Sequence, residues 1–364
     1  MPNLHELLKE LVAKGGSDLH ITTGVPPMMR LHGRINPMGA DVLSAAETKA
    51  LAYSMITDAQ KHKFEENREL DFSFGVKGLA RFRANVFLQR GAVAVAIRAI
   101  QTKIHTFQEL GLPKIVEELC NKPKGLVLVT GPTGAGKSTT LATMVDKINS
   151  EKQEHILTIE DPIEFIHQHK KCIVNQRELH SDTFSFKNAL KSVLREDPDK
   201  ILIGEMRDLE TIEAALVIAE TGHLVFATLH TNSAEQSINR IIDVFPAHQQ
   251  PQVRAQLSFV LEGVICQTLL PKTSGQGRVM VMEIMVPNAA IRNLIREDKV
   301  HQIYSTMQTG QEKFGMVTQN QSLLDHFLKR NISLEQALAA TTRPDELMQM
   351  TQRAQPGAAV SARR

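Results

Sequence analysis

A glycine-rich segment in the middle of the chain has the residue types that bind phosphates. It reads Gly-Pro-Thr-Gly-Ala-Gly-Lys-Ser, which is the phosphate-loop pattern G-x-x-x-x-G-K-[ST]. Its glycines let backbone N–H groups close around phosphates, its lysine can pair with the β- and γ-phosphates, and its serine hydroxyl can reach Mg²⁺. The candidate nucleotide-binding residues are Gly131, Pro132, Thr133, Gly134, Ala135, Gly136, Lys137, Ser138 and Thr139.

The residues on either side of this pattern support its interpretation as a phosphate loop. Gly125–Thr130 is an apolar run typical of a buried strand, and Ser138–Val145 is typical of a helix. Strand, loop and helix are the context that the motif requires, and a helix N-terminus favours bound anions. We therefore predict a site for ATP and Mg²⁺, with Lys137 as a catalytic residue.

Two acidic clusters supply candidates for the hydrolytic step. Glu164 follows the apolar run Ile156–Ile159, and Glu205 follows Ile201–Ile203. Both should lie at the strand ends, where ligands bind in open α/β sheets. Gly204 stands where an aspartate usually precedes the glutamate, so Glu205 is expected to hold Mg²⁺ through water, together with the Ser138 hydroxyl, or to act as the base. Either glutamate can be the water activator.

The elements that must position these residues form an alternating pattern from Leu126 onward. Five short apolar runs are typical of buried strands: Leu126–Val129, Ile156–Ile159, Ile201–Ile203, Leu224–Thr228 and Val279–Met285. Helical stretches lie between them, at Lys137–Asn149, Phe186–Leu194, Leu209–Glu220 and Ser233–Ile242. Such alternation predicts the α/β class, with a parallel sheet covered by helices on both faces.

The rest of the chain divides around this core. Residues 1–102 mix strands with helices, among them Leu4–Lys14 and the run Ser44–Asn67, and predict a smaller α+β domain. Residues 103–124 form a linker, and 125–287 form the ATPase core. Residues 288–351 are mostly helical, and 352–364 are expected to be a disordered tail.

Composition argues against several classes of function. The 42 basic and 40 acidic residues leave a net charge of +2, and there are no tryptophans and only two tyrosines, so a nucleic-acid partner is not expected. The three cysteines lie far apart and predict neither disulfides nor zinc. The first residues lack the pattern of a secretory signal, and no apolar run is long enough to span a membrane. A cytoplasmic protein is the expectation.

Together these motifs resemble those of the secretion-superfamily hexameric ATPases. The resemblance rests on the phosphate loop, the acidic box Thr158–Glu164, the second acidic run Ile201–Asp208 and a histidine box, Thr221–Asn232. A further motif resembles the signature of the type IV pilus retraction motors within that family. Its residues are Ala290, Ile291, Arg292, Asn293, Leu294, Ile295, Arg296 and Glu297.

The resemblance implies a RecA-like P-loop ATPase domain, an N-terminal PAS-like domain and a helical C-terminal region with the retraction motif. It implies a homohexamer that binds ATP between subunits and docks on a PilC-like inner-membrane platform protein at the pilus base. Such a ring would drive pilus retraction and twitching motility, and could work beside a retraction paralogue. No nucleic acid and no zinc would take part.

Three further residues are candidates for contacts with the nucleotide. Alternation along Ala80–Val86 sends Arg81 and Arg83 to one strand face, where they form either a surface ladder or an anion site. The family resemblance makes them arginine fingers that reach a neighbouring subunit's nucleotide. His230 follows an apolar strand and is either a buried structural histidine or a γ-phosphate sensor.

The motif from Ala290 also reads as an ordinary helix, capped by Asn288, with Ile291, Leu294 and Ile295 packed and with solvated arginines. Its match to the retraction signature favours a role in retraction over one in hydrolysis. The alternatives within the family are an accessory retraction motor and an extension or secretion motor. Outside it, the alternatives are a RecA-like nucleic-acid translocase and a non-catalytic nucleotide-binding scaffold.

Overall fold

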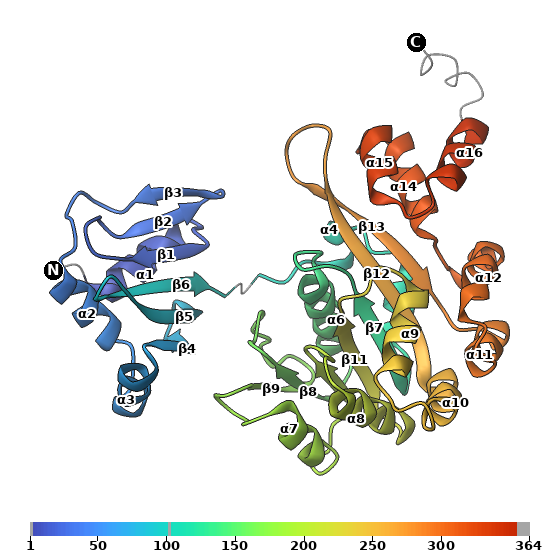
Figure 1. The fold of residues 1–364 in the computed structure, drawn as a ribbon, viewed down its shortest axis with the longest axis horizontal. Helices are drawn as coiled ribbons and strands as arrows, with labels where there is room; N and C mark the ends of the chain where they lie inside the picture. The colour runs from blue at the N-terminus through green and yellow to red at the C-terminus, as the bar shows by residue number, and fades with distance from the viewer. Residues whose placement is uncertain (1–2, 101–102, 355–364) are drawn as a thin grey trace. The chain divides into compact units, whose positions relative to one another are not determined.

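The chain folds into two compact units, which are described separately here. A computed structural model of the protein describes residues 3–100 and 103–354 (Figure 1). The N-terminal unit contains the described residues up to Lys103 and also the segment Pro162–Ile166. The second unit contains Ile104–Asp161 and the described residues from His167 onward.

The N-terminal unit is built on an antiparallel sheet with strand order β3-β2-β1-β6-β5-β4. Its strands are β1 (Asp18–Ile21), β2 (Met28–Leu31), β3 (Arg34–Pro37), β4 (Glu69–Val76), β5 (Ala80–Gln89) and β6 (Ala92–Ala99). Every pairing between neighbouring strands in this sheet is antiparallel. Buried and exposed residues alternate along β5, with Phe82, Ala84 and Val86 buried in the core of this unit. This is the alternation that the sequence predicts for Ala80–Val86.

Three helices complete this unit: α1 (Leu4–Ala13), α2 (Ala45–Tyr53) and α3 (Asp58–Asn67). The helix predicted over Ser44–Asn67 as one run is in fact two. Thr57 and Gln60 form a capping box, in which each side chain binds the other residue's backbone N–H. That reciprocal cap starts a new helix at Asp58 and ends the earlier one before it.

The second unit is built on a seven-stranded sheet with strand order β13-β12-β7-β11-β10-β8-β9. Its strands are β7 (Gly125–Thr130), β8 (His155–Glu160), β9 (Ile173–Glu178), β10 (Lys200–Ile203), β11 (Leu224–Leu229), β12 (Leu261–Pro271) and β13 (Arg278–Met285). The pairings from β12 through β9 are parallel, as the sequence predicts. β13 departs from this prediction, because it returns antiparallel to β12 as the second arm of a hairpin.

Two strands of this sheet were not predicted from the sequence. β12 takes up most of the largely apolar run Leu257–Leu270 and ends at Pro271. Polar residues within this run break the continuous apolar pattern by which a buried strand is recognised from sequence. β9 has three partly or fully exposed residues in its middle, Asn175, Gln176 and Arg177, so its pattern lacks the continuous apolar run of the central strands. An edge strand needs only one covered face, and this weakens its sequence signal.

Helices cover both faces of the sheet, as Figure 1 shows. Leu126 and Leu128 of β7 pack in one cluster with residues of α7 (Phe186–Val193), α8 (Leu209–Glu220), α9 (Ala234–Asp243) and α10 (Gln250–Val260). The alternate residues Val127 and Val129 pack on the other face, with α5 (Lys114–Cys120) and α6 (Lys137–Glu151). Because all six residues of β7 are buried, the loop that follows it leaves from the centre of the core.

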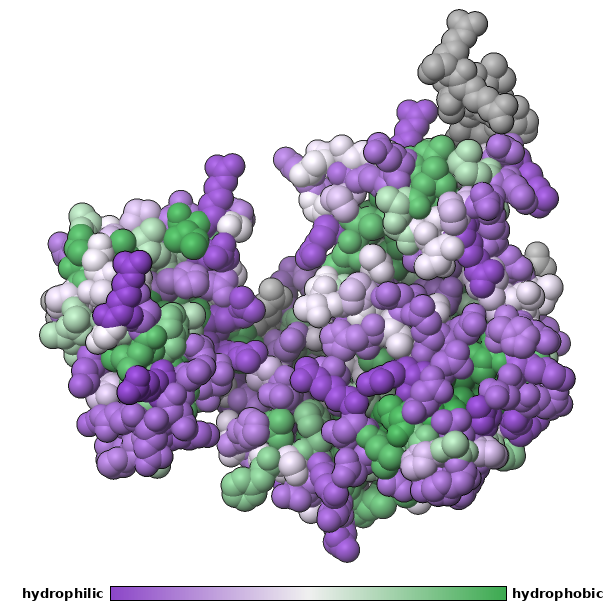
Figure 2. All heavy atoms as spheres, in the orientation of Figure 1, coloured by the Kyte–Doolittle hydropathy of each residue, from purple (hydrophilic) through white to green (hydrophobic). Residues whose placement is uncertain are grey.

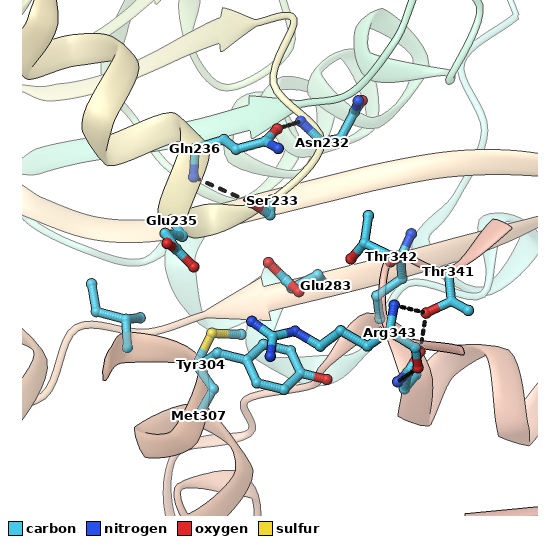
Figure 3. Close-up of a pocket in the computed structure, with 13 residues that line it drawn as sticks. Asn232, Ser233, Glu235, Gln236, Glu283, Tyr304, Met307, Thr341, Thr342 and Arg343 are labelled. Carbon is cyan, nitrogen blue, oxygen red and sulfur yellow. Dashed lines mark hydrogen bonds between the residues drawn. The ribbon is translucent and has the colours of Figure 1, made fainter. Parts of the chain in front are cut away.

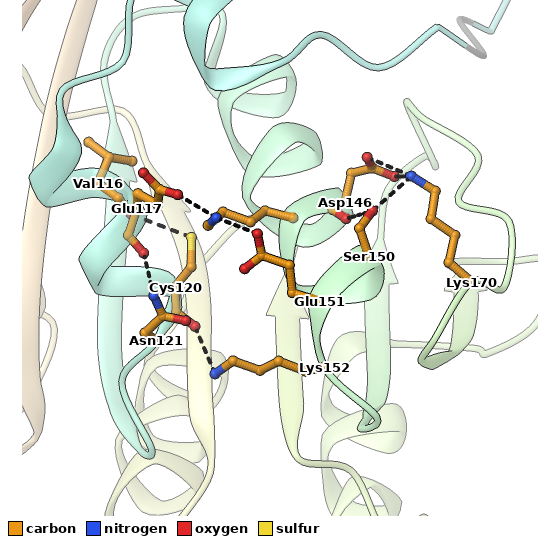
Figure 4. A network of polar contacts seen from close by, with 10 residues as sticks. Val116, Glu117, Cys120, Asn121, Asp146, Ser150, Glu151, Lys152 and Lys170 are labelled. Carbon is orange, nitrogen blue, oxygen red and sulfur yellow. Dashed lines mark hydrogen bonds and ion pairs between the residues drawn. The ribbon is translucent and has the colours of Figure 1, made fainter.

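The expected linker contains two short helices, α4 (Phe107–Leu110) and α5. Thr106 and Glu109 form the predicted capping box, and Gly111 ends α4 in the left-handed conformation. Lys147 of α6 pairs with Glu117 of α5 and, at 2.7 Å, with Glu151 on its own helix. Figure 4 shows Glu117 and Glu151 at this contact. These ion pairs hold α5 against the last turns of the helix that follows the phosphate loop.

The C-terminal part of the second unit is helical. After α11 (Ala289–Arg296) come the 3₁₀ turn η1 (Val300–Gln302) and α12 (Ile303–Thr309), α13 (Gln311–Phe314), α14 (Gln319–Leu328), α15 (Leu334–Ala340) and α16 (Pro344–Ala354). The prediction that the chain is disordered from Gln352 is wrong at the start of that segment, because α16 continues to Ala354. Leu347 and Thr351 are buried and fix this last helix. Residues 355–364 lie outside the described part of the chain.

On the face in Figure 2, hydrophilic side chains predominate and hydrophobic ones lie in small separate groups. Among the residues that the structure describes, no helix is both long and apolar enough to cross a bilayer.

Candidate active site

The phosphate loop begins where β7 leaves the core. Gly131, Gly134 and Gly136 have φ angles of +140°, +79° and +87°, a region that favours glycine. Gly136 is the N-cap of α6, so the free N–H groups of the first helical turn face the loop. Their partial positive charge, added to that of the helix dipole, makes the loop a site for phosphate anions.

Lys137 is the first residue of α6 and bends back over this loop. Its Nζ atom donates to the carbonyl oxygens of Gly131, at 2.8 Å, and Pro132, at 3.2 Å. The ammonium group is therefore held at the loop by neutral acceptors. A phosphate oxygen is a charged acceptor and forms a stronger hydrogen bond, so it can compete for this cation.

The strand ends bring together two residues that the sequence predicts for the site. β10 and β11 are parallel neighbours, so Glu205 and His230, which follow them, lie at the same edge of the sheet. His230 Nε2 lies 3.1 Å from Glu205 Oε1. Glu205 Oε2 accepts a hydrogen bond from Arg207 Nη2 at 2.8 Å, so each carboxylate oxygen has a basic partner.

The electrostatics of Glu205 favour its ionised form. Partial burial acts to raise the pKa of this carboxyl, but the Arg207 hydrogen bond and the charges of His230 and Arg207 outweigh burial and lower the pKa. Glu205 is therefore a carboxylate near neutral pH, as a metal-bound water or a base would require. Arg207 was missed from the sequence, although it stands only two residues after Glu205.

The close packing around Gly204 explains why this acidic motif has a glycine in place of its usual aspartate. A Cβ atom at Gly204 would lie 3.1 Å from Cα of Glu160 and 3.3 Å from the carbonyl oxygen of Ile159, both on β8. The Gly204 carbonyl also accepts a 2.5 Å hydrogen bond from Thr228 Oγ1 on the other side. A larger residue would have to displace backbone on the neighbouring strand.

Glu164, Arg81 and Arg83 belong to the N-terminal unit. The segment Pro162–Ile166 groups with that unit, and Glu164 is exposed. Arg81 donates to Ser73 Oγ at 2.7 Å, whereas Arg83 is exposed and paired across strands with Arg98. The roles of these residues in catalysis remain predictions.

A row of charges crosses the sheet at Arg83. Arg98 donates to Asp18 Oδ1 at 2.8 Å, and Arg30 on the next strand lies 3.6 Å from the same carboxylate. Burial acts to raise the pKa of Asp18, while Ser17 and Arg98 lower it more, so the pKa falls below its usual value. Asp18 thus balances only one of the three arginine charges, and the row keeps a positive surplus that includes the exposed Arg83.

The retraction motif forms the predicted helix, α11, and Asn288 caps it by accepting from the N–H of Ile291 at 2.9 Å. The expectation that both arginines are solvated is wrong for Arg292. Its guanidinium donates to the carbonyls of Ser258, at 2.7 Å, and Phe259, at 3.0 Å, and to Glu262 Oε1 at 2.8 Å. Arg292 is therefore a C-terminal cap of α10.

The start of α9, just after the histidine box, is fixed by a buried carboxylate. Glu283 of β13 is 5% exposed and accepts from the N–H of Ala234, the first residue of α9, at 2.8 Å. Burial raises the pKa of Glu283, although this bond and one from the Gln319 N–H act to lower it. Glu283 lines a polar pocket of ≈ 360 Å³, and the Arg343 guanidinium in this pocket lies 3.9 Å from the Tyr304 ring centroid. Figure 3 shows these three side chains around the pocket. Nothing in the sequence predicts the hydrogen bond from the Ala234 N–H to Glu283.

A parallel sheet with a phosphate loop after a central strand, and a carboxylate and a histidine on the adjacent strand ends, defines a P-loop nucleotide-binding protein of the RecA-like class. The chain belongs to the family described as "Type II/IV secretion system protein", whose model matches residues 1–338.

Two curated relatives and one solved structure are similar over nearly all of the chain. "Type IV pilus retractation ATPase PilT" of Pseudomonas aeruginosa is 52% identical over 94% of this chain and 99% of its own length. "Type IV pilus ATPase PilU" of the same organism is 43% identical over 95% and 90%. The crystal structure of "the Pilus Retraction Motor PilT and Bound ADP" has a TM-score of 0.90 and 53% identity, and covers 96% of this chain and 100% of that chain.

Proposed function

We propose that this chain is an ATP-hydrolysing motor subunit that powers type IV pilus retraction and twitching motility. The observation that carries the proposal is the 52% identity to a retraction ATPase over 94% of this chain and 99% of the relative. The geometry of the phosphate loop and of Glu205 supports the hydrolytic part. The helix from Ala289 to Arg296, which holds the retraction motif, supports the mechanical part.

ATP binding follows from the loop. The N–H groups from Gly134 to Ser138 surround the phosphates, and Lys137 moves its hydrogen bonds from the Gly131 and Pro132 carbonyls to phosphate oxygens. The donor set fits Mg²⁺, because Ser138 offers a hydroxyl and Glu205 a carboxylate at one edge of the sheet. When bound, Mg²⁺ neutralises phosphate charge; Ser138 would hold it directly and Glu205 through water, since Arg207 and His230 already occupy both carboxylate oxygens.

Hydrolysis requires a positioned water. Glu205 accepts hydrogen bonds in its ionised form, so it can orient a water toward the γ-phosphorus and receive its proton. The water oxygen then bonds to the γ-phosphorus while the bond to the bridging oxygen breaks, which gives ADP and phosphate. Glu164 is the alternative activator, and His230 would couple Glu205 to the γ-phosphate.

The family is hexameric, and we infer that the ring completes the site. Arg81 and Arg83 would reach the nucleotide of a neighbouring subunit and stabilise charge in the transition state. The positive surplus at Arg83 supports this role. We further propose that the ring lies in the cytoplasm, docked on a PilC-like platform protein at the inner membrane.

An assay of phosphate release tests the enzymatic part. The purified chain should hydrolyse ATP, and Lys137→Ala should abolish hydrolysis. The matched control is Lys329→Ala, which removes an exposed lysine that pairs with Asp325 at the surface, an interaction worth little. An inactive wild-type hexamer would refute the proposal, and stimulation by DNA would favour a nucleic-acid translocase instead.

A second candidate is an accessory retraction motor, supported by the 43% identity to the relative named PilU. The two are separated by complementing strains that lack either the main or the accessory motor. Restored twitching only in the strain without the accessory motor would favour this second candidate. Restoration in the strain without the main motor would favour the first.

A further inference from the structure

Gln267 is a buried polar residue beneath the phosphate loop that no motif includes. It lies on β12, is 2% exposed, and its Nε2 donates to the carbonyl of Ala135 at 2.8 Å in a buried hydrogen bond. The two residues are 132 positions apart in the chain. The bond is therefore a tertiary contact between the loop and a strand outside the motif.

The same residue touches the loop at two glycines. A Cβ atom at Gly131 would lie 2.2 Å from the backbone oxygen of Gln267, and one at Gly136 would lie 3.3 Å from its Nε2. Cys266, the residue before it, is the last partner of β7 in the parallel ladder, opposite Thr130. Gln267 thus follows directly on the strand pairing that feeds the loop, and its position is fixed by the sheet.

The direction of the hydrogen bond gives it a consequence for the nucleotide. A trans peptide is planar, and its C=O and N–H groups point in opposite directions. Holding the Ala135 carbonyl toward β12 therefore turns the N–H of Gly136 away from β12 and toward the open side of the loop. That N–H belongs to the set that surrounds the phosphates.

The amide group is suited to this task. An apolar side chain of similar size would fill the space but would donate nothing, and a carboxylate would place an acceptor against the Ala135 carbonyl. Oε1 of Gln267 has no hydrogen-bond partner among the described residues although it is buried, a state that is normally costly. The one hydrogen bond that this buried amide makes through Nε2 is the bond to the loop, which points to the Nε2 donor as the part that matters.

We propose that Gln267 is a positioning residue for the phosphate loop, which aims the Gly136 N–H at bound phosphates through the Ala135 peptide. The proposal rests on the proposed function for the identity of the ligand, a nucleoside di- or triphosphate. It adds β12 to the phosphate-binding machinery, and it makes the affinity for phosphates depend on a residue outside the motif.

Nucleotide binding by Gln267→Met and Gln267→Glu hexamers tests the proposal, with ADP and AMP as probes and Gln276→Met as the control. Gln276 is an exposed glutamine in the β12–β13 turn. Gln267→Met should weaken ADP binding about tenfold, as loss of one hydrogen bond in the cradle would, while AMP binding stays within about twofold. Gln276→Met should bind both as the wild type does.

Gln267→Glu provides the second readout, which also serves if Gln267→Met does not fold. At pH 8 the introduced carboxylate should weaken ADP binding more than methionine does. At pH 5 a protonated carboxyl can donate to the Ala135 carbonyl, so ADP affinity relative to the wild type should recover. Equal losses for ADP and AMP, or a loss in Gln267→Glu that does not change with pH, would overturn the proposal. Binding of ADP by the wild type without hydrolysis of ATP would instead count against the proposed function.

Discussion

Replacing Arg292 by alanine should loosen the end of α10, which packs against the retraction helix. The guanidinium donates to two of the last carbonyls of α10, from Ser258 and Phe259, and to the Glu262 carboxylate. The last carbonyls of a helix have no partner within the helix, so an outside donor stabilises its final turn. The side chain is only 23% exposed, which limits the access of water to these bonds.

The magnitude follows from these contacts. A hydrogen bond to a charged group contributes about 1.5–3 kcal/mol, but the three bonds share one guanidinium and are not additive. The carbonyls can partly rehydrate, and Glu262 keeps Lys122 at 2.8 Å. We therefore expect a loss of about 2–3 kcal/mol for Arg292→Ala. Arg296→Ala removes an exposed cation 5.8 Å from the Phe259 ring and weaker hydrogen bonds to Ser258 Oγ, at 3.5 Å, and Asn293 Oδ1, at 3.2 Å. We expect a loss of about 0.5–1 kcal/mol.

Hydrogen exchange over residues 250–262 measures this difference directly. A local loss of about 2–3 kcal/mol raises exchange by about 30- to 150-fold, whereas Arg296→Ala should raise it less than about fivefold. Arg292→Lys should resemble alanine more than arginine, because an ammonium cannot supply the forked donors. Equal protection in the Arg292 and Arg296 variants would refute the assignment of Arg292 as a cap. A loss of pilus retraction in Arg292→Ala must therefore be read beside this stability measurement.

Three further predictions concern carboxylates and their partners. Glu205→Gln should bind ATP about as tightly as the wild type but hydrolyse it at least about 100-fold more slowly in single-turnover assays; an unchanged rate would transfer the role of water activator to Glu164. Arg207→Ala should raise the pKa of Glu205, so the acidic limb of the pH profile of kcat/KM should move to higher pH, and an unmoved limb would contradict the role of this ion pair. Glu283 has a raised pKa in the folded chain, so the folded state binds more protons than the unfolded state above the ordinary value of 4.5, and stability is lost as pH rises through the folded pKa. Glu283→Gln cannot ionise, and its urea midpoint relative to the wild type should rise between pH 4 and pH 8; a constant difference would count against burial of the charge.

The parts of the site that the sequence predicts are those set by local chemistry. The glycines of the phosphate loop, the caps at Thr106 and Asn288, and the strand end before Glu205 depend on residues within a few positions of one another. The parallel sheet follows from the alternation of apolar runs and helices. These signals survive in a single sequence because neighbouring residues carry them.

Apart from Arg207, which stands two residues after Glu205, the parts that were missed depend on contacts between distant residues. Arg292 and Ser258 are 34 positions apart, and Glu283 and Ala234 are 49 apart. In the sequence, Gln267 is only a polar residue within an apolar run. Its role depends on the sheet, which places β12 beside β7 so that Gln267 contacts the loop. Likewise Arg292 reads as a solvated helix residue until α10 lies against α11 and offers its carbonyls.

Direct observation of labelled pili tests the central claim, that ATP hydrolysis by this chain retracts them. A retraction-deficient strain should carry many static pili. The wild-type chain should restore retraction events and twitching, while Lys137→Ala and Glu205→Gln should leave the pili extended and Lys329→Ala should behave as the wild type. Pili that stay extended, in cells that still do not twitch when the wild-type chain is supplied, would contradict the account.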